Sequence, residues 1–245
     1  MCHSHDSRPP APPERAEVTE PGAVTLRAAD GSPLPAHVAR PAGRSRGRIV
    51  VLPDVRGLHP YYRDLAVRFA EAGFDAIAID WFGRTAGEGD RGADFDWKPL
   101  IPQVDPADVA CDVTTAAAHL EGLGAGGPLF TVGFCFGGSQ SWRLAASDVD
   151  LAGVIGFYGR PQLVDDIVEA MHRPMLLLVA GADAATSAEE SAAFQARLTD
   201  AEVPFEAHTY EGAPHSFFDR SHTEWGDACA DAWRRILDFT ARRGA

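Results

Sequence analysis

The chain has 245 residues, which suffices for one large α/β domain or two small ones, and its 45% apolar and 23% charged residues are typical of a globular protein. Thirty-five acidic against 22 basic side chains give a net charge of −13. Nucleic acids and anionic membranes are bound through clustered Lys and Arg, so we expect neither as a partner.

The N-terminal region differs in composition from the rest of the chain. Residues 1–21 contain five prolines among charged side chains and few apolar ones, which predicts a disordered Pro-rich tail. The chain begins without the apolar segment of a secretory signal, and no apolar run approaches the length of a transmembrane span. The four cysteines lack CxxC spacing, so we expect a reduced, cytoplasmic protein, either a monomer or a homodimer.

Strand and helix patterns alternate from Val24 onward, without a further linker, so residues 22–245 are predicted to form a single domain. Strands are expected at Val24–Arg27, His37–Arg40, Arg48–Pro53, Phe74–Ile79, Leu129–Gly133, Gly153–Tyr158, Pro174–Ala180 and Phe205–Tyr210. Helices are expected at His59–Ala72, from Pro106 to about Leu120, after Gly137, from Ser187 to about Leu198, and at His222–Ala241.

This alternation predicts an α/β fold with a mostly parallel sheet and helices on both faces. In such a fold the reactive side chains gather at the carboxyl ends of the strands. The loops that follow the predicted strands are therefore the places to search for a site.

The motif Gly133-Phe134-Cys135-Phe136-Gly137-Gly138 follows one of these strands and precedes a helix. It has the form of the nucleophile elbow G-x-S-x-G, with cysteine in place of serine. The glycines permit a strained, tightly packed turn, and the N-terminus of the following helix favours a thiolate. Cys135 is therefore the candidate nucleophile, whereas Cys111 and Cys229 lie in helices without such a context.

Two further strand ends carry the groups that an elbow nucleophile needs. In the α/β-hydrolase fold the chain order is nucleophile, acid, histidine. Asp183 follows the predicted strand Pro174–Ala180, and His215 lies in the Gly/Pro loop after the last strand. We expect His215 to take the proton of Cys135 and Asp183 to orient the imidazole.

Together, the cysteine elbow, Asp183 and the segment Gly212-Ala-Pro-His-Ser-Phe217 resemble the dienelactone hydrolase family of α/β-hydrolases, from about Ile49 to Phe239. The resemblance implies the α/β-hydrolase fold and a Cys-His-Asp triad that opens an ester or lactone through an acyl-thioester. It implies no metal or organic cofactor. The best-known members of the family hydrolyse dienelactone.

The resemblance also implies further site residues, with two departures. The family places a glutamate beside the resting thiol, and the matching position here is Asp54, one methylene shorter; alternatively Asp54 is an ordinary turn residue. The family binds the substrate carboxylate with two arginines. Arg84 matches the first, and Arg220 lies one residue from the second. Alternatively, Arg84 forms a loop salt bridge to Glu88 or Asp90.

Two other features complete the expected site. The backbone N–H groups of Phe136, directly after the nucleophile, and of Val55, after the first core strand, are expected to form the oxyanion hole. An apolar substrate pocket is expected from aromatic residues near strand ends, namely Trp81, Phe82, Tyr158 and Phe217. Cys2, His3 and His5 are metal-ligating residue types, but a flexible tail cannot orient them, so no metal centre is expected.

Three functions remain open on this basis. The first is a cysteine hydrolase of the dienelactone type that acts on a small, carboxylate-bearing lactone or ester. The second is a general carboxylesterase with a broader pocket. The third is a binding protein that uses the same fold without catalysis.

Overall fold

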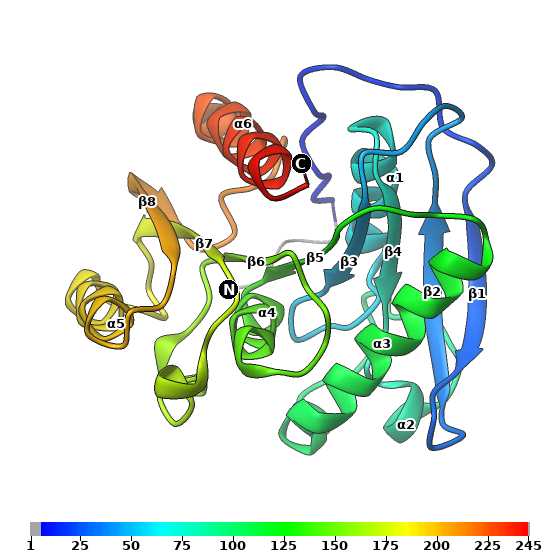
Figure 1. Cartoon of the computed structure of the whole chain (residues 1–245), viewed down its shortest axis with the longest axis horizontal. Coiled ribbons are helices and arrows are strands. Elements are labelled where there is room, and N and C mark those ends of the chain that lie inside the picture. The colour runs from blue at the N-terminus through cyan, green and yellow to red at the C-terminus, as the bar shows by residue number, and fades with distance from the viewer. Residues whose placement is uncertain (1–5, 245) are drawn as a thin grey trace.

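The computed structural model of the chain describes residues 6–244, and Figure 1 shows its sheet flanked by helices. The strands are β1 Gly22–Arg27, β2 Pro33–Ala39, β3 Arg48–Leu52, β4 Asp75–Ile79, β5 Leu129–Phe134, β6 Gly153–Phe157, β7 Met175–Ala182 and β8 Phe205–Pro214. The helices are α1 Pro60–Glu71, α2 Gly83–Ala86, α3 Pro106–Gly122, α4 Phe136–Arg143, α5 Ala188–Asp200 and α6 Gly226–Arg243.

Within the described residues the strands form one eight-stranded sheet in the order β1-β2-β4-β3-β5-β6-β7-β8. The pairs β1–β2 and β2–β4 are antiparallel, and every other neighbouring pair is parallel. This confirms the predicted fold class. The carboxyl ends of β3, β5, β6, β7 and β8 consequently lie along one edge of the sheet.

The two faces of the sheet support separate apolar clusters because successive strand residues point to opposite sides. In β3, Ile49 and Val51 pack with α1 and α6, whereas Val50 and Leu52 pack with α3. Figure 1 shows α1 and α6 together on one face, with α3 and α4 on the other. The central strands are buried on both faces, as their continuous apolar runs predict.

Helix boundaries follow local chemistry, with small differences from the sequence prediction. Asp105 caps α3 by accepting a hydrogen bond from the backbone N–H of Ala107, and Ser187 forms a capping box with Glu190 at the start of α5. The closing helix α6 begins at Gly226, four residues later than expected, because a 3₁₀ turn at Thr223–Trp225 precedes it. The expected helix after Gly137 begins at Phe136.

The N-terminal segment differs from its prediction as a disordered tail; its first five residues lie outside the described part. Among its described residues, Ser7, Pro9, Pro10 and Pro12 are buried. Prolines bury apolar surface and are already restricted in φ, so an extended Pro-rich segment loses less conformational entropy when it packs. Further along, Val18 forms an isolated bridge with Pro41. From residue 6 to residue 244, none of the helices has the length and apolar character to cross a bilayer.

Candidate active site

Cys135 occupies the sharp turn between β5 and α4, at the edge of the sheet where the carboxyl ends of the parallel strands lie. Its backbone has φ 55° and ψ −116°, a region that residues other than glycine rarely adopt. Two backbone hydrogen bonds hold this conformation: the Cys135 N–H donates to the Phe157 carbonyl (3.0 Å), and the Ser139 N–H donates to the Cys135 carbonyl (3.2 Å). The strained geometry predicted for the elbow is present.

The glycines of the motif are required by close backbone contacts. A Cβ on Gly133 would overlap the carbonyl of Gly137, and a Cβ on Gly137 would overlap the carbonyls of Leu52 and Pro53. A Cβ on Gly138 would lie 2.6 Å from the Phe157 carbonyl oxygen. The elbow therefore fits against β3 and β6 only because these positions lack side chains.

The structure brings His215 and Asp183 together from two neighbouring strand ends. Asp183 directly follows β7 and His215 directly follows β8, and His215 Nδ1 lies 2.7 Å from Asp183 Oδ2. The other carboxylate oxygen, Oδ1, accepts a hydrogen bond from the backbone N–H of Ala185 (2.8 Å). The carboxylate is thus fixed at both oxygens, with only 3% of the Asp183 side chain exposed.

The pKa of His215 depends on its contacts with both Asp183 and Cys135. Burial alone lowers the pKa of this imidazole, but hydrogen bonds to Asp183 and to Cys135 outweigh burial and raise the pKa to about 9. The Tyr158 ring packs against the imidazole with 4.8 Å between ring centroids. Cys135, His215 and Asp183 therefore form a connected chain of side chains, in the order predicted for a nucleophile, a base and an orienting acid.

Phe136 and Val55, whose N–H groups are the candidates for the oxyanion hole, lie just after β5 and β3, respectively. Phe136 is the first residue of α4, where a helical N–H has no intrahelical partner. Val55 lies in the turn after β3, and in the described chain no backbone hydrogen bond from its N–H is found. Both residues are only partly buried, and the oxyanion hole stays a prediction.

Asp54, expected beside the thiol, lies in an ion pair with Arg56. The Arg56 Nη2 is 2.7 Å from Asp54 Oδ2, the Nε is 3.1 Å from both oxygens, and the Arg56 backbone N–H donates to Oδ1 (2.9 Å). Asp54 is 1% exposed. Burial raises the pKa of Tyr158 well above its ordinary value, and nearby charges at Cys135 and Asp54 add to this rise. Asp54 and Cys135 therefore share a neighbour in Tyr158.

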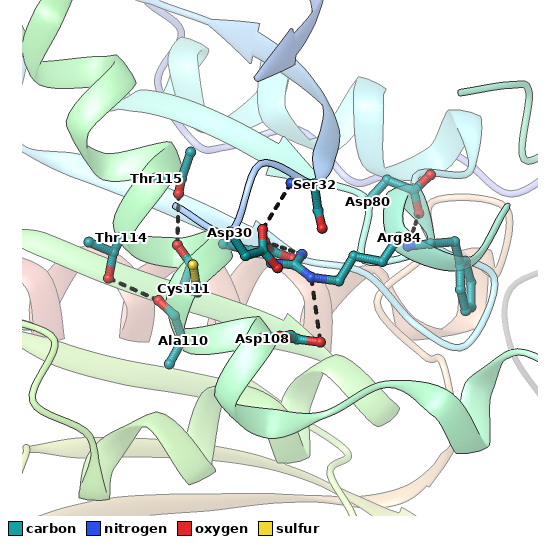
Figure 2. Close-up of polar contacts among 11 residues, drawn as sticks. Asp30, Ser32, Asp80, Arg84, Asp108, Ala110, Cys111, Thr114 and Thr115 are labelled. Atoms are coloured by element: carbon teal, nitrogen blue, oxygen red, sulfur yellow. Dashed lines mark hydrogen bonds and ion pairs between the residues drawn. The ribbon is translucent and has the colours of Figure 1, made fainter. Parts of the chain in front are cut away.

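Arg84, expected to bind a substrate carboxylate, instead contacts three carboxylates of the protein. Its guanidinium forms a hydrogen bond with Asp112 and lies 3.1 Å from Asp30 and 3.4 Å from Asp108, and Figure 2 shows the contacts with Asp30 and Asp108. This interaction joins α2 to the β1–β2 turn and to the first half of α3. A substrate carboxylate would have to displace one of these aspartates, so the geometry favours a structural role.

The carboxylates that contact Arg84 are not Glu88 or Asp90, the salt-bridge partners expected from the sequence. Asp90 pairs with Arg63 (3.1 Å), and the aspartates that contact Arg84 come from elements distant in sequence. Burial raises the pKa of Asp112 to about 6, even though its hydrogen bond to Arg84 acts in the opposite direction. The local sequence gave no signal for this tertiary contact.

Arg220 and the predicted aromatic wall are distributed between surface, site and core. Arg220 is exposed, and its backbone N–H donates to the Arg8 carbonyl (3.0 Å). Trp81 packs against Phe136, with ring centroids 5.3 Å apart, and so lies next to the elbow. Phe82 and Phe217 are buried core side chains: Phe82 packs on Phe95, and Phe217 packs on Phe157, Tyr158 and Tyr210. Tyr158 also packs on His215 and so lies at the site.

Sequence reasoning gave too little weight to the loop after β3 and the start of α1. Arg56 is a buried cation whose charge acts on two fully buried tyrosines, Tyr61 and Tyr62. The spacing Asp-x-Arg immediately after a buried strand was the available signal. In the described part of the chain, no group of three His, Cys, Asp or Glu side chains is arranged to hold a metal ion.

Known proteins resemble the chain along most of its length. The dienelactone hydrolase family model matches residues 34–243. The carboxymethylenebutenolidase of Rhodococcus opacus is 28% identical, over 99% of this chain and 97% of its own length. A Salmonella typhi protein assigned as a carboxymethylenebutenolidase is 28% identical, over 90% of this chain and 87% of its own length.

A solved structure agrees with these relatives. A Klebsiella pneumoniae protein assigned to the dienelactone hydrolases has a TM-score of 0.79 and 26% identity, covering 92% of this chain and 99% of that one. The match thus includes nearly the whole fold, with the elbow and both later strand ends inside the family region. The chain belongs to the dienelactone hydrolase family, a family of ester-hydrolysing enzymes with the α/β-hydrolase fold.

Proposed function

We propose that the protein is a cysteine hydrolase that opens a small, carboxylate-bearing lactone or ester through an acyl-thioester on Cys135. The observation that carries this proposal is the chain of contacts from Asp183 through His215 to Cys135, which ends at a strained elbow. A carboxylate that orients a histidine beside a nucleophile is the arrangement that acyl transfer requires.

The first half of the reaction forms the thioester. His215 accepts the thiol proton, and Sγ of Cys135 adds to the substrate carbonyl carbon, which shifts the carbonyl electron pair to oxygen. The N–H groups of Phe136 and Val55 stabilise this oxyanion. When the carbonyl re-forms, the bond to the ester oxygen breaks, and that oxygen takes the proton from His215. For a lactone, the leaving hydroxyl remains attached to the acyl group.

The second half consumes one water molecule. His215 removes a proton from water as the oxygen attacks the thioester carbonyl. Collapse of this second intermediate breaks the C–S bond, and Sγ recovers its proton from the imidazolium. The products are a carboxylic acid and the free enzyme. The contacts that raise the pKa of His215 stabilise the imidazolium that forms in each step.

The substrate class follows from the relatives and from local charge. The relatives are named for a butenolide that carries a carboxymethylene group, and a carboxylate on the substrate requires a local cation in a protein with a net charge of −13. Arg56, in the turn after β3, is a buried cation near the carboxyl end of that strand, and Asp54 already binds its guanidinium. Arg84 supports this role poorly because three aspartates surround it.

The engagement of Arg84 also favours a second candidate, a general carboxylesterase that accepts neutral esters. A carboxylated lactone and its methyl ester separate the two. The proposed function requires a higher kcat/KM for the free carboxylate. A higher value for the methyl ester would leave the general carboxylesterase in its place.

The nucleophile is tested with Cys135→Ala and Cys135→Ser on p-nitrophenyl acetate. We expect Cys135→Ala to lose turnover while it keeps its circular dichroism and melting temperature, and Cys135→Ser to be strongly impaired, since a hydroxyl is harder to deprotonate than a thiol. Intact-protein mass spectrometry should detect an acylated species that hydroxylamine removes. Turnover by a folded Cys135→Ala variant would contradict the mechanism. The absence of both turnover and an acylated species in the parent protein would favour a binding function without catalysis.

A further inference from the structure

The loop that follows His215 begins with a strained residue. Ser216 has φ 66°, a conformation that residues other than glycine adopt rarely, and it is 3% exposed. Such strain persists only where the surrounding structure fixes the backbone on both sides. On the upstream side, β8 and the His215–Asp183 hydrogen bond supply this restraint. The downstream residues must supply the rest.

Several contacts hold the downstream part of the loop, residues 217–221. Phe217 and Phe218 are fully buried, and their carbonyls accept hydrogen bonds from the Cys229 thiol (3.5 Å) and the Tyr61 hydroxyl, respectively. Asp219 is also fully buried, and its Oδ1 accepts the backbone N–H of Ser221 (2.9 Å). The loop is thus tied to α1 and α6.

A further restraint comes from the opposite end of the chain. The Arg8 backbone N–H donates to Asp219 Oδ1 (3.0 Å), and the Arg8 carbonyl accepts from the Arg220 backbone N–H (3.0 Å). Two residues later, the Pro10 carbonyl accepts a hydrogen bond from the Trp233 indole (3.2 Å). Residues 7–12, here named the N-terminal strap, therefore bridge the His215 loop and α6.

We propose that the N-terminal strap is a positioning element for catalysis: through the paired hydrogen bonds of Arg8 with Asp219 and Arg220, it fixes the loop that presents His215 to Cys135. The strap acts through the loop and does not touch the reacting atoms. The inference rests on the proposed role of His215 as the base. A shift of this loop by a fraction of an ångström would lengthen the His215 contacts to Asp183 and Cys135, and catalysis is sensitive to such displacements.

Arg8→Pro and Arg8→Ala form a matched pair for the test. Proline lacks the N–H that donates to Asp219 but keeps the carbonyl that accepts from Arg220. Alanine keeps both backbone groups and removes the same side chain. The difference between the two variants therefore reports on the loss of this hydrogen bond together with the restriction of φ that proline imposes. A deletion of residues 2–10 removes the hydrogen bond without that restriction and provides a second, stronger perturbation, and Ile236→Val in the α6 core provides a control for general destabilisation.

Three measurements follow each variant: kcat and KM with p-nitrophenyl acetate, the rate of Cys135 alkylation by iodoacetamide across pH, and the His215 titration by NMR, assigned with His215→Gln. Relative to Arg8→Ala, we expect Arg8→Pro to lower kcat about tenfold with little change in KM. The His215 pKa should move from its raised value toward the ordinary one, and the alkylation profile should shift with it. Ile236→Val should lower the melting temperature without these changes.

The outcomes separate the strap from the proposed function. Equal kcat, alkylation and His215 titration in Arg8→Pro and Arg8→Ala would overturn the strap's role, whatever their stabilities. The same shifts in Ile236→Val would also overturn it, because they would follow from destabilisation alone. The NMR titration requires no turnover, so it tests the strap even if a folded Cys135→Ala variant were to refute the nucleophile. If Arg8→Pro does not fold, the deletion and the control are compared in the same way.

Discussion

Asp183→Asn is the substitution that best tests the proposed base, because the carboxylate contacts His215 through one oxygen and the backbone through the other. The pKa of His215 is about 9 against an ordinary value of 6.5, because its hydrogen bonds outweigh the effect of burial. At about 1.4 kcal/mol per pKa unit, the surroundings stabilise the imidazolium by roughly 3 to 4 kcal/mol. Screening by solvent is small, since the two side chains are 5% and 3% exposed. Asp183 and Cys135 share this contribution.

Asparagine removes the charge and can present an N–H to Nδ1, which favours the wrong tautomer. We expect kcat/KM for p-nitrophenyl acetate to fall roughly 10²- to 10⁴-fold and the His215 pKa to fall toward its ordinary value. Since a raised histidine pKa stabilises the folded state below the unfolded pKa, the parent protein should lose this stability as pH rises from 6.5 through about 9. The variant should lose less over that range.

Steady-state kinetics, NMR titration of His215 and urea unfolding between pH 6 and 10 measure these effects. Asp200→Asn is a matched control, because Asp200 is an exposed aspartate at the end of α5. An Asp183→Asn variant with parental kcat/KM would refute the triad. So would an unchanged His215 pKa, because the carboxylate would then not be stabilising the imidazolium.

Three other substitutions test separate parts of the structure. Arg84→Ala should lower the free energy of unfolding by about 2–4 kcal/mol at pH 7.5 and by less at pH 5, where the buried Asp112 is protonated. Urea unfolding at the two pH values checks this. A loss of kcat/KM confined to carboxylated substrates would instead restore Arg84 as a substrate-binding residue. Asp54→Asn should speed iodoacetamide alkylation of Cys135, because a nearby carboxylate disfavours the thiolate; an unchanged rate from pH 6 to 9 would leave Asp54 as a partner of Arg56 only. Gly137→Ala should abolish activity and lower the melting temperature, because its Cβ would overlap two carbonyl oxygens; an active, equally stable variant would show that the elbow can relax.

The fold and the candidate triad were accessible from sequence because both depend on local signals. Apolar runs such as residues 48–52 identify strands buried on both faces, and the elbow glycines mark a turn that only a few backbones can form. Asp183 and His215 were found because a strand end specifies where the following residue lies. These are features of neighbouring residues and of chain order.

The parts that sequence reasoning missed depend on contacts between distant segments. Arg84 meets Asp30, 54 positions earlier, and Asp108 and Asp112 on α3, and nothing near Arg84 specifies these partners. The N-terminal strap was expected to be disordered because its composition offers little apolar surface of its own. Its docking surface is supplied by α6 and by the loop near Asp219, more than 200 residues away in sequence.

The strained backbone of Cys135 sets catalysis against stability at a single position. A positive φ costs a residue with a side chain of the order of 1–3 kcal/mol, and only glycine avoids this cost, yet glycine has no sulfur. Selection for stability alone would therefore favour a residue that cannot catalyse, and retention of a side chain here is itself a sign of use. Among inactive replacements, alanine keeps the Cβ and hence the strain, whereas glycine releases it. The stability difference between Cys135→Ala and Cys135→Gly, corrected for the greater entropy of glycine in the unfolded chain, thus measures what the fold gives up to hold a side chain at the proposed nucleophile.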